Sequence, residues 1–158
     1  MIPRRPLFVA AGAALATAMA GGAMTRVDAW YRALEKSTLN PPDWAFAPGW
    51  TIIFALAALS ATIGWRDART QRDRSLLVIF FFINAVLNIA WSAVFFTLRR
   101  PDWALAEVAT LWISVAVIAV FLARFSRTAS LLMLPYLGWV TFAAYLNYKV
   151  AALNGPFG

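Results

Sequence analysis

The chain has 158 residues, of which 62% are hydrophobic and 13% charged, and its mean hydropathy is +0.68. Soluble domains are closer to half apolar and a quarter charged, so this composition excludes an ordinary soluble domain and indicates a membrane protein. The sequence contains no Cys and no His, which excludes disulfides, thiolate chemistry and the commonest ligand of zinc and haem iron. The net charge of +7 does not indicate nucleic-acid binding, because the basic residues lie almost wholly in short gaps between apolar runs.

Five segments are apolar and long enough to cross a bilayer as helices, since about 20 residues are needed for one crossing. They cover residues 6–25, 44–65, 76–98, 103–123 and 128–148. The predicted fold is therefore all-α, a polytopic membrane protein whose single domain, residues 1–158, is a bundle of five transmembrane helices. The last three connections are short, so consecutive helices are expected to be antiparallel neighbours. The basic residues divide eight to six between the two sides, which does not decide the orientation.

The first span has an alternative interpretation. Two arginines precede its apolar run and Ala18-Met19-Ala20 follows it, a pattern typical of a cleaved signal peptide. The apolar run is longer than that of a typical signal peptide, which favours a retained span. Gly12, Ala16 and Ala20 recur at steps of four and predict the close approach of a neighbouring helix.

The third span carries polar residues on one face. Asn84, Asn88, Trp91 and Phe95 follow helical spacing, so all four are expected to face the bundle interior. Polar groups inside a membrane indicate a functional site by default. The alternative is a pair of interhelical hydrogen bonds, worth about 1 kcal/mol each.

Two other spans carry matching faces. In the second span, Trp50 and Phe54 lie on one face just after Pro48. The fifth span repeats a face at steps of four, with these residues: Pro135, Trp139, Ala143 and Asn147. Three helices thus predict an apolar, aromatic-walled pocket with a few hydrogen-bonding groups, which is the usual form of a small-molecule site. For each of these tryptophans the alternative is ordinary helix packing.

The remaining tryptophans have simpler interpretations. Trp44, Trp65 and Trp103 lie at span ends, where the indole ring anchors a helix at the membrane interface. Trp112 is assigned to ordinary helix packing. The only formal charge inside a span is Glu107, which we expect to pair with an arginine at position 99 or 100 or to bond a neighbouring helix.

The long first loop, residues 26–43, is predicted to act as a lid over the pocket. Residues 30–36 are expected to form a short amphipathic helix, which the prolines at positions 41 and 42 terminate. Tyr31 is the expected ligand contact of this lid. Arg32 or Lys36 would then lie at the cavity mouth, in reach of an acidic group on a ligand.

Several motifs occur in order along the chain. They are Trp30-Tyr31, Leu34 and Lys36; Pro41-Pro42, Trp44, Phe46, Pro48 and Trp50; Leu87-Asn88, Trp91-Ser92 and Phe95-Phe96; Leu111-Trp112; Leu134-Pro135-Tyr136 and Trp139; Leu146-Asn147 and Leu153-Asn154. In this order and spacing, from about Trp30 to Asn154, the chain resembles the tryptophan-rich sensory protein / translocator protein family. That family is also called the peripheral benzodiazepine receptor family.

The resemblance implies a five-helix membrane bundle, often a homodimer, with a ligand cavity toward the first loop. It implies binding of porphyrins such as protoporphyrin IX and, in some members, of haem, sterols or synthetic benzodiazepine-type ligands. No obligatory cofactor is expected, and the localisation expected is a multi-pass protein of a bacterial cell envelope, in the inner or the outer membrane. The pocket and the resemblance together give these expected ligand-binding residues: Tyr31, Pro42, Trp50, Phe54, Asn84, Asn88, Trp91, Phe95, Trp139, Ala143 and Asn147.

The chain departs from the family pattern at Ser37, where Pro is common, at Phe54, where Tyr is usual, and at Asn84, where Gln is usual. The last two changes alter hydrogen bonding in the pocket and leave its ligand preference open. A proposed sterol motif of the family is matched by Val140, Tyr145 and Lys149, but such patterns carry little weight.

The function predicted is that of an integral membrane tetrapyrrole-binding protein that senses, regulates or handles porphyrins. One alternative is a transporter of porphyrins or other hydrophobic small molecules, although no broken helix pair of the kind found in many carriers is visible. The other is light- and oxygen-dependent breakdown of porphyrin. Enzymatic turnover is not favoured, because no positioned nucleophile or general base can be found, so no catalytic and no metal-binding residues are predicted.

Overall fold

The structure is a computed structural model that describes residues 3–157, and all regular elements within them are helical. The long helices are α1 (Arg4–Met24), α3 (Phe46–Asp67), α4 (Gln71–Ser92), α5 (Pro101–Ala123) and α7 (Leu134–Asn154). The short segments are α2 (Ala29–Ala33), a 3₁₀ turn η1 (Asp43–Ala45), a π-helical turn η2 (Ala93–Thr97) and α6 (Arg127–Leu132). Five of the helical stretches are long and apolar enough to cross a membrane, which confirms the predicted all-α, five-span fold.

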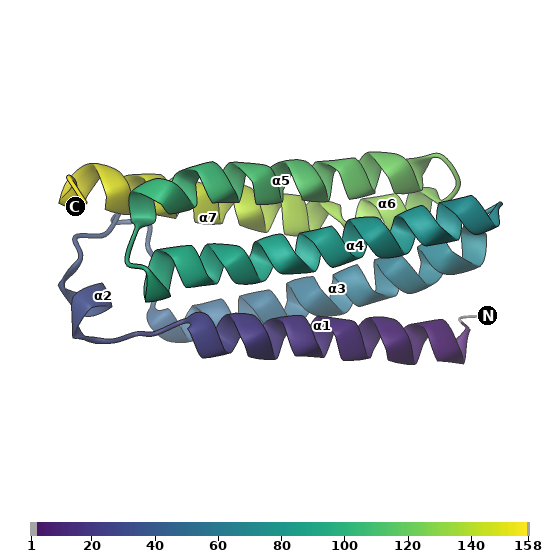
Figure 1. Cartoon of the computed structure of the whole chain (residues 1–158), viewed down its shortest axis with the longest axis horizontal. Helices are drawn as coiled ribbons and strands as arrows, with labels where there is room; N and C mark the ends of the chain where they lie inside the picture. Colours follow the sequence, from purple (N-terminus) through teal and green to yellow (C-terminus); the bar gives the residue numbers. More distant parts are fainter. Residues whose placement is uncertain (1–2, 158) are drawn as a thin grey trace.

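The long helices lie side by side, and the first loop with α2 caps the end of the bundle where the C-terminus also lies (Figure 1). α5 packs against α4 and α7, while α1 packs against α3 and α4. Most lipid-facing side chains are large and apolar, among them Phe8, Phe82 and Val120. The polar side chains therefore have to find partners inside the bundle or at its two ends.

Two helix boundaries differ from the predicted spans for local reasons. α4 begins at Gln71, before the apolar run, because Thr70 and Asp73 form a reciprocal cap: each backbone N–H donates to the other side chain at 3.1 Å. The predicted span 128–148 consists of two helices that meet at Met133. Pro135 explains the break, because proline has no N–H to donate and restricts the residue before it.

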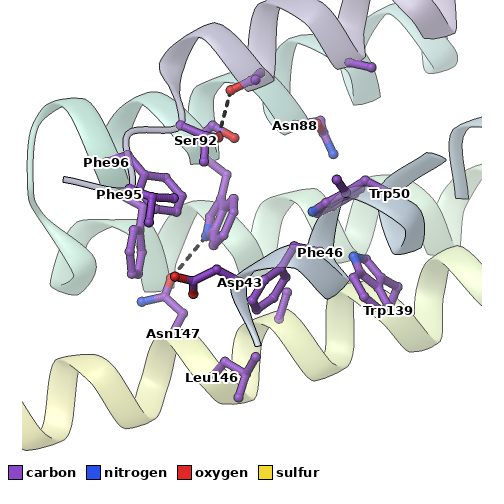
Figure 2. Close-up of a pocket in the computed structure, with 18 of the residues that line it drawn as sticks. Asp43, Phe46, Trp50, Asn88, Ser92, Phe95, Phe96, Trp139, Leu146 and Asn147 are labelled. Atoms are coloured by element: carbon purple, nitrogen blue, oxygen red, sulfur yellow. Dashed lines mark hydrogen bonds between the residues drawn. The ribbon is translucent and has the colours of Figure 1, made fainter. Parts of the chain in front are cut away.

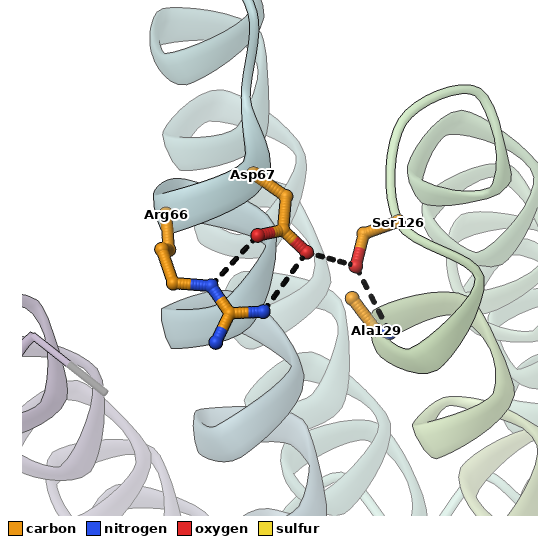
Figure 3. A network of polar contacts seen from close by, with 4 residues as sticks. All are labelled: Arg66, Asp67, Ser126 and Ala129. Carbon is orange, nitrogen blue, oxygen red and sulfur yellow. Dashed lines mark hydrogen bonds and ion pairs between the residues drawn. The ribbon is translucent and has the colours of Figure 1, made fainter. Parts of the chain in front are cut away.

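The bundle end opposite the loop is held by polar contacts (Figure 3). Asp67 at the end of α3 accepts hydrogen bonds from Arg66 at 2.7 Å and from the Ser126 hydroxyl at 2.6 Å. The Ser126 oxygen in turn caps α6 by accepting from the Ala129 N–H, and the Ser60 hydroxyl donates to the Ala129 carbonyl at 2.7 Å. These bonds fix α3 to the turn between α5 and α6.

The π-helical turn at the end of α4 changes which side chains face inward. The Leu98 N–H donates to the Ala93 carbonyl, five residues back, at 2.9 Å. In a regular helix adjacent residues point about 100° apart, and the wider turn brings two neighbours to the interior. Phe95 and Phe96 are accordingly 4% and 9% exposed. The chain then reverses at Arg99, which adopts a left-handed conformation with φ of 54°.

A chain of hydrogen bonds links α4, α5 and α7. The Asn88 amide donates to the Tyr136 hydroxyl at 3.0 Å, and that hydroxyl donates to Asn84 Oδ1 at 3.1 Å. The Asn84 amide donates to Ser114 Oγ at 2.8 Å, and Ser114 donates to the Leu111 carbonyl at 2.7 Å. Because the last acceptor is a backbone carbonyl, the direction of every bond in the chain is fixed. Tyr136, 1% exposed, is its centre.

Replacing Tyr136 by Phe is expected to destabilise the bundle by about 1–2 kcal/mol, because two buried carboxamides lose a partner. Thermal unfolding in detergent, followed by circular dichroism, measures this effect. Tyr148→Phe is the matched control, since Tyr148 lies on the same helix and is 56% exposed. Equal melting temperatures for the two variants would show that the hydrogen-bond chain does not hold the helices together.

Candidate ligand-binding site

A cavity of about 420 Å³ lies at the loop end of the bundle, between α1, α3, α4 and α7 and next to α2. Its walls are aromatic and small apolar side chains with a few polar groups, and Figure 2 shows many of these turned toward a common space. The lining residues are Ala18, Gly21, Gly22, Thr25, Val27, Tyr31, Asn40, Asp43, Phe46, Ala47, Trp50, Thr51, Phe54, Asn88, Trp91, Ser92, Phe95, Phe96, Trp139, Phe142, Ala143, Leu146, Asn147 and Val150.

Trp50 is the centre of one aromatic wall. Its ring stacks on Phe54 with centroids 5.5 Å apart and planes 26° apart. It also meets Trp139 and Tyr136 edge to face, at centroid distances of 6.0 and 6.2 Å. These are favoured aromatic geometries, so α3 and α7 hold the ring in a defined position beside the cavity.

Trp91 forms part of the facing wall, and its polar atom is already used. The indole N–H donates to Asn147 Oδ1 at 3.1 Å, the bond drawn beside Asn147 in Figure 2. The Asn147 amide donates in turn to the Pro101 carbonyl at 2.8 Å, which joins α4, α7 and α5. Trp91 packs on Phe95 with ring centroids 5.5 Å apart. Trp91 can therefore offer a ligand its ring surface, while its N–H remains bonded.

Two other lining residues have polar atoms without partners. The buried indole N–H of Trp139 has no hydrogen-bond acceptor among the described residues. The Asn88 amide is committed to Tyr136, which leaves its Oδ1 as an acceptor on the side that faces Gly21 of α1. An unpaired buried polar group costs about 1–3 kcal/mol. The site thus offers one acceptor, Asn88 Oδ1, to a bound molecule, while the Trp139 nitrogen has almost no accessible surface.

Gly49 determines where the Trp139 ring can lie. A Cβ atom added at Gly49 would overlap the six-membered part of that ring. The close approach of the ring to the backbone of α3 therefore requires a residue without a side chain at this position. No feature of the sequence alone distinguishes Gly49 from the other glycines.

The first loop lines the end of the cavity that we call its mouth, through Val27, Tyr31, Asn40 and Asp43. Asp28 caps α2 by accepting from the Tyr31 N–H at 3.1 Å and pairs with Arg99 at 2.9 Å. The Tyr31 N–H and, to a smaller extent, Arg99 hold the pKa of Asp28 below its usual value. Burial, with a smaller contribution from the Asp43 carboxylate, raises the pKa of Tyr31 to about 12. The Tyr31 hydroxyl therefore stays protonated and lies beside the Asp43 carboxylate.

Most of the predicted site residues surround this one cavity, namely Tyr31, Trp50, Phe54, Asn88, Trp91, Phe95, Trp139, Ala143 and Asn147. Two do not line it. Asn84 lies one turn deeper, where Ser114 and Tyr136 occupy its carboxamide. Pro42 precedes η1 and does not line the cavity, whereas its neighbour Asp43 does.

The sequence did not lead us to expect that α1 lines the cavity. The prediction placed Gly12, Ala16 and Ala20 against a neighbouring helix, yet the position of a Cβ at Gly12 has nothing within 4 Å. The cavity is lined by another face of this helix, which includes Ala18, Gly21, Gly22 and Thr25. This face also has helical spacing, so the pattern was present in the sequence, but the small residues on every side of α1 conceal it.

The predicted pairing of Glu107 with an arginine is wrong. Arg99 pairs with Asp28 and Arg100 pairs with Asp102, so neither reaches Glu107. The carboxylate oxygens of Glu107 are buried without a partner among the described residues.

Lys36 does not face the cavity either. Its Nζ donates to the Tyr31 carbonyl at 2.7 Å and to the Leu34 carbonyl at 3.2 Å, and lies 4.4 Å from the Tyr31 ring centroid. The lysine thus stabilises the end of α2. Trp112 also departs from simple packing, because its indole N–H donates to Thr141 Oγ1 at 2.8 Å.

A sequence model of the TspO/MBR family matches residues 8–153, which include nearly the whole bundle. The chain belongs to the TspO/MBR family. It is 40% identical over 155 residues to the tryptophan-rich protein TspO of Chlorobaculum tepidum, covering 94% of this chain and 95% of that protein. It is 35% identical to the tryptophan-rich sensory protein of Cereibacter sphaeroides, over 93% of this chain and 89% of that one.

Similarity within the TspO/MBR family extends to animals. The chain is 31% identical to the translocator protein of Sus scrofa over 122 residues, covering 77% of this chain and 72% of that protein. Family membership and the five membrane-length helices together identify a multi-pass integral membrane protein of the sensory and translocator type.

Replacing Gly49 by Ala is expected to displace the Trp139 ring and so alter the near-ultraviolet circular dichroism of the tryptophans. Ligand binding in the cavity should weaken with it. Gly138→Ala is the control, because Gly138 precedes Trp139 on α7 and a Cβ there meets nothing within 4 Å. If Gly49→Ala leaves the spectrum as unchanged as Gly138→Ala does, the close packing of Trp139 on α3 is refuted.

Proposed function

We propose that this TspO/MBR protein binds a porphyrin-type tetrapyrrole, such as protoporphyrin IX, within the membrane and thereby senses or handles porphyrins. The observation that carries the proposal is the convergence of Trp50, Trp91 and Trp139 on one cavity of about 420 Å³. Cavities of this size are typical of small-molecule sites. A flat aromatic ring gains most from indole faces and edges held in fixed positions.

The free carboxamide oxygen of Asn88 also suits such a ring. A metal-free porphyrin carries two pyrrole N–H donors and two imine nitrogen acceptors on the same ring. Asn88 Oδ1 can accept from a pyrrole N–H. Binding would then satisfy the acceptor that the empty cavity leaves without a partner.

The residues present fit a metal-free ring better than haem. Haem iron is held by His, Cys, Met or Tyr side chains. The sequence has no His or Cys, and among the described lining residues only Tyr31 belongs to this group. Its raised pKa opposes the phenolate form that iron would require. Within residues 3–157 no three His, Cys, Asp or Glu side chains gather at one point.

The loop over residues 26–43 is proposed to be the lid of this site. Trp30 and Tyr31 pack on Phe95 and Phe96, with ring centroids 6.3 and 5.3 Å apart. The loop is fixed at its start by the ion pair between Asp28 and Arg99. Farther along, Asn154 holds the backbone of Glu35 through two hydrogen bonds of 2.8 Å. These contacts have to break for the loop to open.

As the family resemblance implies, we expect the protein to assemble as a homodimer.

Protoporphyrin IX is expected to quench the intrinsic tryptophan fluorescence with a saturable dependence on concentration. Trp139→Leu removes a wall, and Ala143→Leu fills space, so each should weaken binding by about tenfold or more. Ala152→Leu is the control, because Ala152 is an exposed residue of α7 outside the cavity. Quenching that does not saturate, or that is equal in both cavity variants and the control, would reject this site.

Two further measurements separate binding from the alternative functions. Movement of porphyrin across liposome membranes that contain the protein would support transport. Product formed under illumination, but not in the dark, would support light-dependent breakdown. Binding without either result is expected for a sensor.

Asp28→Ala is expected to speed the release of bound porphyrin, because α2 loses its cap and the loop loses its ion pair. Dissociation is measured by stopped-flow fluorescence after dilution into excess empty detergent micelles. Asp73→Ala removes a capping carboxylate of α4 at the opposite end of the bundle and should leave the rate unchanged. Equal dissociation rates for the two variants would contradict the role of the loop as a lid.

A further inference from the structure

The charge at the mouth of the cavity comes from one residue. Among the described lining residues, Asp43 alone carries a formal charge. It is the first residue of η1, and its side chain points from the start of the second span into the cavity (Figure 2). A negative charge therefore stands where a ligand bound between the tryptophans would present its outer end.

Three basic side chains at the same end of the bundle are bonded to other groups of the protein. Arg99 pairs with Asp28, and Arg100 pairs with Asp102. Lys36 is held by two backbone carbonyls of α2. None of these three side chains lines the cavity, so none of them is placed to neutralise an anionic ligand inside the mouth.

An anionic group on the ligand would meet a repulsion from the Asp43 carboxylate. Asp43 is exposed, so water weakens this repulsion on the solvent side, while most of the lining on the cavity side is apolar. Even fully in water, two unit charges 4 Å apart interact strongly enough to change affinity by about fivefold.

We propose that Asp43 is a specificity-determining residue that disfavours anionic ligands and favours flat apolar rings whose outer end is neutral or cationic. The inference rests on the proposed tetrapyrrole site and adds to it the charge that the ligand presents at the mouth. A dicarboxylic porphyrin then binds less tightly than the same ring with its carboxylates masked. This outcome is opposite to the expectation that a basic loop residue would hold a propionate.

The position of Asp43 has a second explanation that the test must separate. An acidic residue in the first turn of a helix is stabilised by the helix dipole, whatever the ligand. A role limited to that stabilisation would change the binding of all ligands by the same factor. The charge of the ligand must therefore be varied while its ring is kept constant.

Three probes share one ring: protoporphyrin IX with two carboxylates, its dimethyl ester, and its diamide with ethylenediamine, which carries two ammonium groups. Each is titrated at pH 8 in the same uncharged detergent against the wild-type protein and Asp43→Asn. We expect Asp43→Asn to tighten binding of the diacid by about fivefold, leave the ester unchanged and weaken the diammonium probe by a similar factor. These differences should shrink as salt is added.

Asp43→Glu keeps the charge and should retain the wild-type order of the three probes. Arg26→Gln tests the rival cation, because Arg26 lies between the lining residues Thr25 and Val27. The proposal is overturned if Asp43→Asn shifts all three affinities equally, or if Arg26→Gln weakens the diacid while Asp43→Asn does not affect it. If the ester itself fails to bind saturably to the wild-type protein, the tetrapyrrole site fails and Asp43 loses its role with it.

Discussion

Polar side chains inside a lipid-embedded bundle must find partners within the protein, and the hydrogen-bond chain through Tyr136 meets that requirement here. Asn84, Asn88 and Ser114 each enter the chain with a fixed donor and acceptor. Because the chain ends on a backbone carbonyl, its free end is the Oδ1 of Asn88. The same bonds that join α4, α5 and α7 therefore leave Asn88 Oδ1 as the free acceptor beside the cavity.

The two ends of the bundle serve different purposes. At one end Asp67 and Ser126 tie α3 to the turn before α6, so the helices are held together there by direct polar contacts. At the other end the helices line the cavity, and the loop bridges them through Asp28 and Asn154. α1 contributes small residues to the lining, which leaves room for a ligand between it and the aromatic walls of α3 and α7.

Hydropathy and the 3.6-residue period were sufficient to predict the five spans and most of the cavity, since Trp50, Trp91 and Trp139 each lie on a face that the spacing reveals. Asn84 was expected to contact the ligand but does not line the cavity. Spacing shows which face of a helix a residue occupies, and not how deep in the bundle its partner lies. The inward turn of Phe96 depends on a π-helical turn, which spacing does not reveal. The pairing of Arg99 with Asp28 depends on tertiary contact between distant segments, so the alternative partner Glu107 could not be excluded from sequence. By contrast, the Thr70–Asp73 cap and the break before Pro135 follow recognisable local signals.

The central claim is that the tryptophan-walled cavity at the loop end holds the flat ligand, and its most direct test is a distance measurement on the complex. With ¹³C-labelled alanine methyl groups, nuclear Overhauser effects from the ring protons of bound protoporphyrin IX dimethyl ester report which alanines contact the ring. Cross-peaks are expected to Ala143 and Ala47, which line the cavity from α7 and α3, and not to the exposed Ala152. Cross-peaks confined to lipid-facing alanines such as Ala152, with none to Ala143 or Ala47, would contradict the proposed site.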